Sequence, residues 1–157
     1  MSATSYTTDA EKFGWSIVQK TVYDFTTENG ATWKTPNGID SAKNNFPVTQ
    51  VSYNDAIAYC KWAKCRLPSY KEYWDIVQHD NRTINENAPS ILPIKETNII
   101  GNVWDITLTE NTAAEIRLAG GSYFCNPYSC NGTSPNRKLF VDKTTGNIHI
   151  GFSVFYE

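Results

Sequence analysis

RLAGGSYFCNPYSC, residues 117–130, contains two of the four cysteines of this chain and separates them by four residues. The Gly-Gly pair in front of them allows a tight turn or a close approach of a ligand to the backbone. Asn126-Pro127 bends the segment between the cysteines, because the residue before a proline is disfavoured in a helix. A bent C-x4-C segment can bring Cys125 and Cys130 together on one side of a loop.

Three kinds of chemistry suit such a pair: a disulfide, half of a tetrathiolate zinc site, or a two-coordinate site for soft Cu(I). The local spacing alone does not separate them. A zinc site would need the other two cysteines, Cys60 and Cys65. Cys60 falls on the apolar face of a predicted helix, where a free cysteine is commonly buried and inert, and this argues against zinc.

The composition predicts one α+β domain over residues 1–157, since 157 residues suffice for one core and 40 % of them are hydrophobic. The net charge of −2 provides no basic surface for nucleic acid. No apolar run is long enough for a membrane span, and the polar start contains no signal-peptide core. We therefore expect a cytoplasmic, reducing location, which argues against a disulfide.

Capping signals and hydrophobic periodicity predict short helices, short strands and a high loop content. A capping box at residues 8–11 predicts a helix toward Phe13, and Ser52 and Ser69 are the expected N-caps of two further helices. The remaining predictions are strands at 15–22, 46–51, 116–118, 139–141 and 148–155, and a long loop over 26–45.

Segments along nearly the whole chain resemble the formylglycine-generating enzyme (sulfatase-modifying factor) family, in the same order as in that family. The block most typical of it is PVTQVSYNDAIAYCKWA at 47–63. The other matches are AEKFG at 10–14, ATWKTPNG at 31–38, RLPS at 66–69, EYW at 72–74, GNVWD at 101–105, the cysteine stretch at 117–130 and IGF at 150–152.

The resemblance implies a C-type-lectin-like fold and a minimal, copper-dependent member of the family. In copper-dependent members the cysteine pair holds Cu(I), a substrate thiol joins it, and O2 is used to convert a peptidyl cysteine to the aldehyde formylglycine. Carried over to this chain, Cys125 and Cys130 are the expected copper ligands, and Ser122 is the expected polar group beside them. Soft thiolates do favour Cu(I), and two of them leave the metal open to further ligands.

The resemblance also implies a structural calcium ion at the GNVWD turn. Its expected ligands are Asn102, the carbonyl of Val103 and Asp105, which are oxygen donors of the kind that a hard cation prefers. The alternative for Asp105 is a turn residue that hydrogen-bonds its own backbone.

The implied substrate is a thiol-bearing peptide or small molecule, with Trp33, Trp104 and Tyr128 as expected walls of its site. Two departures from the family affect this expectation. The Arg-Tyr-Arg that follows the second cysteine is replaced around residues 132–134, and the second tryptophan of the family's Trp-Glu-Trp is Ile106. We expect the copper site to be kept and the substrate to differ.

A copper-dependent oxidoreductase is thus the leading hypothesis for function. The rival is a non-catalytic C-type-lectin-like binding or display protein, for which the polar and aromatic residues of the cysteine loop would be suitable. A degenerate relative that keeps only the fold is a third reading. The cysteine pair favours the enzyme, because a display loop has no need of two thiols at this spacing.

Overall fold

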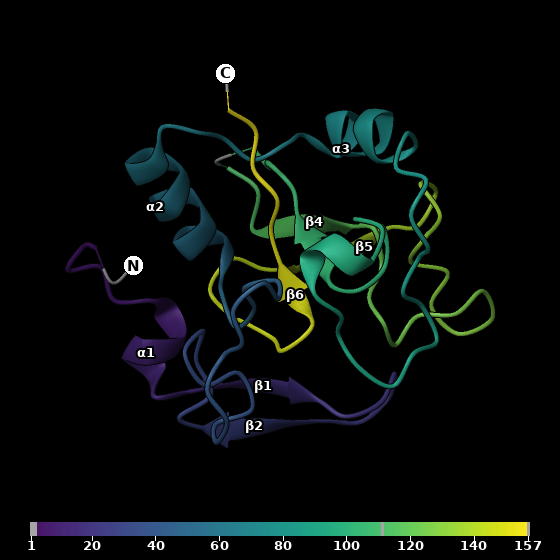
Figure 1. Cartoon of the computed structure of the whole chain (residues 1–157). Coiled ribbons are helices and arrows are strands. Elements are labelled where there is room, and N and C mark those ends of the chain that lie inside the picture. The colour runs from purple at the N-terminus through teal and green to yellow at the C-terminus, as the bar shows by residue number, and fades with distance from the viewer. Residues whose placement is uncertain (1–2, 111, 157) are drawn as a thin grey trace.

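The computed structural model describes residues 3–110 and 112–156, and it confirms an α+β fold with short elements joined by long loops (Figure 1). The helices are α1 (Asp9–Phe13), α2 (Tyr53–Ala63) and α3 (Tyr70–Val77), with a 3-10 turn at Ile94–Glu96. The strands are β1 (Trp15–Gln19), β2 (Phe25–Asn29), β3 (Trp104–Ile106), β4 (Glu115–Ala119), β5 (Leu139–Asp142) and β6 (Ile150–Gly151). None of the described helices has the length and apolar character needed to cross a membrane.

All three α-helices begin where the capping signals predict. In each, a serine or threonine side chain accepts the backbone N–H of the third helical residue, whose carboxylate accepts the N–H of the cap. The three capping pairs are Thr8 with Glu11, Ser52 with Asp55, and Ser69 with Glu72.

The strands form two sheets, a β1–β2 hairpin and a four-stranded sheet in the order β5-β4-β3-β6. The larger sheet is antiparallel except that β6 pairs with β3 in parallel. In Figure 1, α3 lies above this sheet, α2 lies to its left and the hairpin lies below it. Strand β3 is therefore a central strand, and the loop that follows β4 carries the two cysteines of the 117–130 stretch.

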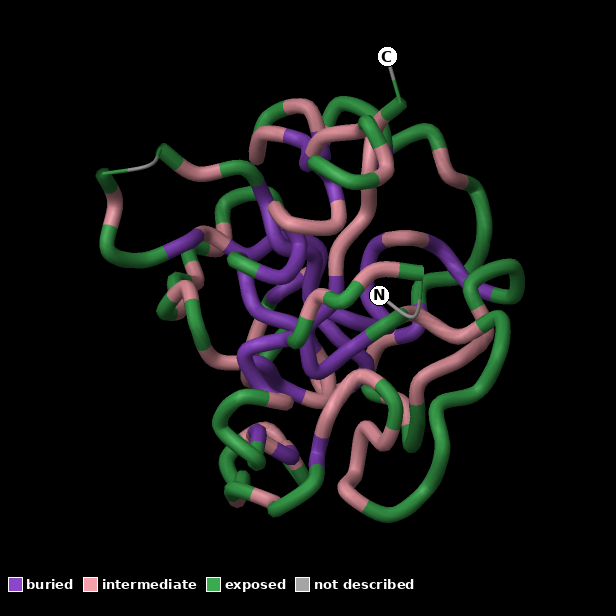
Figure 2. Tube along the Cα trace, turned by 90° about the vertical axis from the view of Figure 1, so that its left-hand side faces the viewer, coloured by how far each residue is buried: buried purple, intermediate pink, exposed green. Residues whose placement is uncertain are grey.

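The main core lies between α2 and the four-stranded sheet. Buried side chains of α2, among them Tyr53 and Ala56, pack with Trp104 and Ile106 of β3 and with Leu118 of β4. Figure 2 shows this buried trace at the centre and the exposed loops around it. Loss of such apolar surface from water is the dominant stabilising term for a chain with so few regular hydrogen bonds.

Three predicted strands differ from the structure. Residues 46–51 form no strand, because Gln50 adopts a left-handed φ of 59° and its side-chain amide donates to the carbonyls of Ile17 and Pro36. The predicted strand over 148–155 is reduced to β6, which pairs only with the three-residue strand β3. The predicted strand over 15–22 ends at Gln19, and part of the predicted loop is β2, its partner.

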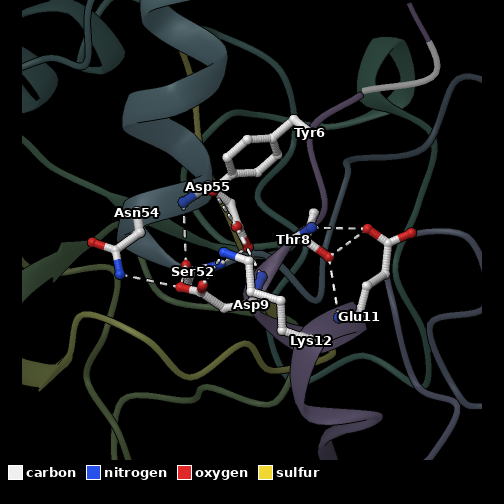
Figure 3. A network of polar contacts seen from close by, with 8 residues as sticks. All are labelled: Tyr6, Thr8, Asp9, Glu11, Lys12, Ser52, Asn54 and Asp55. Carbon is white, nitrogen blue, oxygen red and sulfur yellow. Dashed lines mark hydrogen bonds and ion pairs between the residues drawn. The ribbon is translucent and has the colours of Figure 1, made fainter. Parts of the chain in front are cut away.

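A polar network joins α1 to the start of α2 (Figure 3). The buried carboxylate of Asp55 accepts hydrogen bonds from the Tyr6 hydroxyl at 2.9 Å and from the backbone N–H of Asp9 at 3.0 Å. The carboxylate of Asp9 in turn accepts from the Ser52 hydroxyl at 2.7 Å. Two capping residues of α2 thus also fix the N-terminal segment to the core.

Candidate functional site

Strand β4 leads directly into the cysteine loop through Gly120 and Gly121, both with positive φ (88° and 75°). Only glycine adopts such values without strain, and a Cβ on Gly120 would lie 2.1 Å from the Tyr73 hydroxyl. The chain then turns tightly, because the N–H of Cys125 donates to the Ser122 carbonyl at 2.9 Å. The N–H of Ser122 points back at Cys125 Sγ, 3.4 Å away.

The structure joins Cys125 and Cys130 in a disulfide, with their Cα atoms 5.0 Å apart. The side chain of Asn126 closes the loop between them by accepting the N–H groups of Tyr128 and Ser129, each at 2.9 Å. The zinc alternative is wrong, since no group of three or more His, Cys, Asp or Glu side chains in the described residues is placed to hold a metal. The expectation that this pair would not form a disulfide is therefore wrong.

A cavity of about 380 Å³ lies beside the two cysteines. Ser122 and Trp104 line it together with Cys125 and Cys130, so the structure brings four of the predicted site residues to one place. The other lining residues come from the end of β1 and the connection to β2, from the cysteine loop, from the larger sheet and from the segments before β5 and β6: Gln19, Val22, Tyr23, Leu118, Phe124, Ser129, Arg137, Leu139, Val141, Asn147, His149 and Ile150.

Several polar atoms around this cavity are buried without a hydrogen-bond partner. They are Ser122 Oγ, Ser129 Oγ, Arg137 Nε, Asn147 Oδ1 and His149 Nδ1. Buried polar groups in folded proteins are nearly always paired, so a cluster of unpaired ones beside a cavity indicates a place for water or a polar ligand. Sequence reasoning missed Arg137, Asn147 and His149, because they lie outside the cysteine loop in the chain.

His149 is the most notable addition, since it places an imidazole in the cavity. Burial lowers its pKa to about 4, so the ring is neutral at pH 7. The ring packs edge-on against Phe124, with centroids 5.7 Å apart, and its backbone carbonyl accepts the N–H of Trp104 at 2.8 Å. The sequence offered one signal, a histidine in the alternating run of residues 148–155, which was interpreted only as a strand.

Gly132 packs tightly against the cysteine loop. A Cβ at this position would lie 2.7 Å from Gly121 Cα and 2.8 Å from both Cys125 Sγ and Trp104 Cη2. No larger residue fits without displacing the cysteine. The family's Arg-Tyr-Arg is thus replaced at a position where this chain has no room for an arginine.

The other two predicted substrate contacts lie elsewhere. Tyr128 is 99 % exposed on the surface of the cysteine loop. Trp33 lines a separate groove of about 680 Å³, formed mainly by residues 33–49 and 89–91. Tyr123 and Ile148 also line that groove, whereas their neighbours Ser122 and His149 line the cysteine cavity. The same two segments therefore separate the groove from the cavity.

The GNVWD segment forms a turn followed by a strand, with Gly101 and Asn102 at positive φ. The Asn102 side-chain oxygen accepts N–H groups from Asn85 and Leu92, each at 2.8 Å, and its amide group donates to the Leu92 carbonyl. Asn102 therefore holds the neighbouring loop in place. The Asn102 side chain is a poor candidate ligand for a cation, because its oxygen already accepts these two hydrogen bonds.

Asp105 lies within β3 rather than in a turn, and it is buried. Burial raises its pKa to about 7, and hydrogen bonds from Ser153 only partly offset this. The nearby Tyr73 hydroxyl is also buried, and its pKa is raised well above the ordinary value by burial and then by the charge of Asp105. A cation beside Asp105 would relieve the cost of burying this carboxylate.

The three expected calcium residues do meet at one cavity of about 180 Å³. Asp105 and Val103 line it with Asn102, and Asn98 is a further oxygen-bearing neighbour that the sequence-based prediction did not include. An anionic carboxylate near carbonyl and amide oxygens is the donor type that Ca²⁺ prefers. The residues present thus fit a hard cation through Asp105, with Asn102 as part of the wall.

Comparisons with known proteins agree with this architecture. Residues 3–76 match the family model described as a sulfatase-modifying factor enzyme 1-like domain. A formylglycine-generating enzyme of Thermomonospora curvata is 40 % identical over 91 residues, an alignment that covers 46 % of this chain and 30 % of that protein. A Bos taurus protein named inactive C-alpha-formylglycine-generating enzyme 2 is 38 % identical over 198 residues, covering 90 % of this chain and 65 % of that protein.

The fold itself matches a solved structure, PvdO from Pseudomonas aeruginosa, with a TM-score of 0.62 at 13 % identity over 75 % of this chain and 64 % of that one. The chain spans between about a third and two thirds of the length of these relatives. Their names include both an active enzyme and an inactive one. By its sequence matches, this chain belongs to the sulfatase-modifying factor, or formylglycine-generating enzyme-like, family.

Proposed function

We propose that this chain is a Cu(I)-dependent oxidase that uses O2 to convert a cysteine, or another thiol, to an aldehyde. The observation that carries the proposal is the position of Cys125 and Cys130 in the wall of a cavity that also contains Ser122 and Trp104. The proposal requires reduction of the Cys125–Cys130 disulfide, because thiolates and not a disulfide are metal ligands.

The reduced pair has the donor chemistry that Cu(I) prefers, and both sulfurs lie beside the cavity. When bound there, the metal would supply thiol coordination and activation of O2. The buried position of Cys125, 2 % exposed, would exclude bulk water from this centre.

The residues of the chain have separate roles in this proposal. Ser122 Oγ is buried without a hydrogen-bond partner, and Ser122 lies in the same tight turn as Cys125. Its hydroxyl is therefore available to hydrogen-bond a substrate or an oxygen atom. The neutral imidazole of His149 offers Nδ1 to a second polar group without adding charge. Trp104 provides a flat apolar wall, and the absence of a side chain at Gly132 leaves room for Cys125 Sγ and the Trp104 ring.

We place the remainder of a larger, thiol-bearing substrate in the groove lined by Trp33. The groove has about 680 Å³, room for several residues of an extended peptide, and its wall includes both Asp40 and Lys43. The Nε1 of Trp33 is buried there without a partner and can donate to a peptide carbonyl. Tyr128 would contact only substrate that extends over the outside of the cysteine loop.

We also propose a structural calcium ion at the cavity beside Asp105. The buried carboxylate, with its pKa raised to about 7, supports this, as does the Val103 wall next to it. The role is structural because the cavity lies against Val48 and Phe152, away from the cysteine cavity's lining.

An anaerobic titration tests the copper proposal. The protein is reduced, freed of reductant and titrated with Cu(I) in the presence of a thiol competitor of known affinity. One tightly bound Cu(I) per chain supports the proposal, and loss of binding after reoxidation of Cys125 and Cys130 supports the assignment to this pair. Failure of the fully reduced protein to compete for Cu(I) would exclude it.

A second candidate is a non-catalytic, C-type-lectin-like binding protein. Two observations favour it: the cysteines are joined in a disulfide, and one relative aligned over 90 % of this chain is named inactive. The exposed ring of Tyr128 on the cysteine loop would then be part of a contact surface. One measurement separates the two candidates. After copper loading, only an oxidase would consume O2 together with a thiol substrate.

A further inference from the structure

The other two cysteines are brought together at the end of α2. The helix ends with Lys64 in the left-handed conformation (φ 54°, ψ 48°), and the N–H of Cys65 donates to the Cys60 carbonyl at 3.0 Å. This six-to-one hydrogen bond is typical of a Schellman motif, in which the side chains of the two bonded residues contact each other. In this chain those two side chains are thiols.

Both side chains belong to one apolar cluster, with Cys60 in the buried core and Cys65 packed against it. Cys60 is buried among the apolar side chains of the main core, whereas Cys65 is partly accessible to solvent. The pair thus has the arrangement of a reactive outer thiol with a second thiol behind it. It also repeats the spacing of Cys125 and Cys130, with four residues between the cysteines.

We propose that Cys60 and Cys65 are a second redox-active pair, which closes to a disulfide by exchange with a low-molecular-weight disulfide such as oxidised glutathione. This site is independent of the copper proposal and of the Cys125–Cys130 pair.

The exchange proceeds in two steps. The thiolate of Cys65 attacks one sulfur of the small disulfide, which forms a mixed disulfide at Cys65 and releases one small thiolate. The sulfur of Cys60, losing its proton, then attacks Cys65 Sγ and releases the second. In sum, two protein thiols are oxidised to one disulfide, and one small disulfide is reduced to two thiols.

The environment of Cys60 sets the pace of the second step. Burial, and then the contact with Cys65, raises the pKa of Cys60 to about 12. A sulfur that is protonated at neutral pH attacks slowly. The mixed disulfide at Cys65 should therefore accumulate first and resolve later, faster at higher pH.

Closure would fix a junction of the fold. The next residue, Arg66, exchanges two backbone hydrogen bonds with Phe155, at 3.0 and 2.8 Å, and its guanidinium binds both carboxylate oxygens of Glu72 at the start of α3. A Cys60–Cys65 disulfide would tie the end of α2 to this junction between α3 and the terminal segment.

Tryptic mapping distinguishes the two pairs without ambiguity. Cleavage after lysine and arginine places Cys60 in residues 44–61 and Cys65 in residues 65–66, so their disulfide links two peptides. Cys125 and Cys130 both fall within residues 118–137, so theirs lies inside one peptide. The fully reduced chain is incubated anaerobically with glutathione buffers, free thiols are alkylated, and the digest is measured by mass spectrometry.

We expect a linked 44–61/65–66 peptide, preceded in time by glutathione on Cys65. The equilibrium constant for closure should be about tenfold or more greater in the folded protein than in urea, because the turn at Lys64 holds the two cysteines side by side. Cys65→Ser, at a partly exposed position, should abolish the link. The double variant Cys125→Ser/Cys130→Ser should retain it.

Two results would overturn the proposal. One is complete alkylation of Cys60 and Cys65 in glutathione buffers that close Cys125–Cys130. The other is an equilibrium constant for disulfide closure that is equal in the folded and the urea-unfolded chain. Equal values would mean that the helix end does not favour the Cys60–Cys65 disulfide. The mapping of the unmodified protein gives both results even if a cysteine variant fails to fold.

Discussion

The backbone N–H of Asp9 donates to Asp55 Oδ1 at 3.0 Å, across 46 residues of sequence. The same carboxylate caps α2 by accepting the N–H of Ser52 at 2.9 Å, and it accepts the Tyr6 hydroxyl as well. One buried side chain therefore does two tasks, starting a helix and anchoring the N-terminal segment to it (Figure 3).

Replacement of Asp55 with alanine should lower the free energy of unfolding by about 1.5–3 kcal/mol, because three buried donors lose a charged acceptor. Urea unfolding followed by circular dichroism measures this. Asp75→Ala is the matched control: Asp75 is an exposed helical carboxylate paired with Lys71, and such surface pairs contribute little. Equal losses in the two variants would contradict a special role for the Asp55 network.

Cys125→Ser and Cys130→Ser should each lower the affinity for Cu(I) by more than about 100-fold. Loss of a residue that only hydrogen-bonds a metal ligand already costs roughly 10- to 100-fold in affinity. Each serine variant removes one of two soft ligands. Cys60→Ala should bind Cu(I) like the parent. Competition with a thiol chelator under anaerobic conditions measures all three, and parental affinity in both serine variants would move the copper site elsewhere.

Ser122→Ala should leave stability within about 0.5 kcal/mol of the parent, because the Ser122 hydroxyl is buried without a hydrogen bond to lose. It should nevertheless slow turnover of a thiol substrate. Ser16→Ala is the control for burial, since Ser16 Oγ donates to the Gly146 carbonyl at 2.9 Å and its loss should cost about 1 kcal/mol. A large loss of stability in Ser122→Ala would indicate a purely structural role.

The raised pKa of Asp105 predicts how stability depends on pH. Its folded value of about 7 exceeds the ordinary value of 3.8, so the folded state holds a proton that the unfolded state releases between these values. Without metal, stability should therefore fall as pH rises from about 4 to about 7, by at most roughly 4 kcal/mol from this group. Asp105→Asn should flatten that dependence in urea titrations at several pH values.

Calcium should act in the opposite sense, since it binds the ionised carboxylate. Added Ca²⁺ should raise the melting temperature at pH 7.5, and an excess of chelator should lower it to the metal-free value. Asp105→Asn should respond to neither. An identical melting temperature with and without Ca²⁺, and no metal in the purified protein, would remove the calcium proposal.

The missing Arg-Tyr-Arg of the family leads to an expectation about the substrate. A Cys-x-Pro-x-Arg peptide should be converted slowly or not at all by copper-loaded protein, even in air. Each lost arginine contact removes about 1.5–3 kcal/mol of charge-assisted binding, or roughly 10- to 150-fold in affinity. A smaller thiol should react better. The product mass, which loses sulfur and gains an aldehyde, reports the result, and efficient conversion of the peptide would show that the missing arginines are unnecessary.

Much of this protein follows from local sequence. The three helix starts were predictable because a Ser or Thr with a carboxylate three residues later satisfies the free N–H groups of a helix within one short segment. The family resemblance and the cysteine loop were also apparent, because both depend on residues close together in the chain. The extent of strands was not, since Gln50 and β6 owe their conformation to partners far away in sequence.

The tertiary structure alone decided how the site is assembled. It placed Ser122 and Trp104 with the cysteines, separated Trp33 into another groove, and brought the unpaired His149 into the cavity. It also buried Asp105 in a strand and put Gly132 against Cys125 Sγ. The physical reason is that burial, cavities and unpaired polar atoms arise from contacts between distant segments, and no local pattern encodes those contacts.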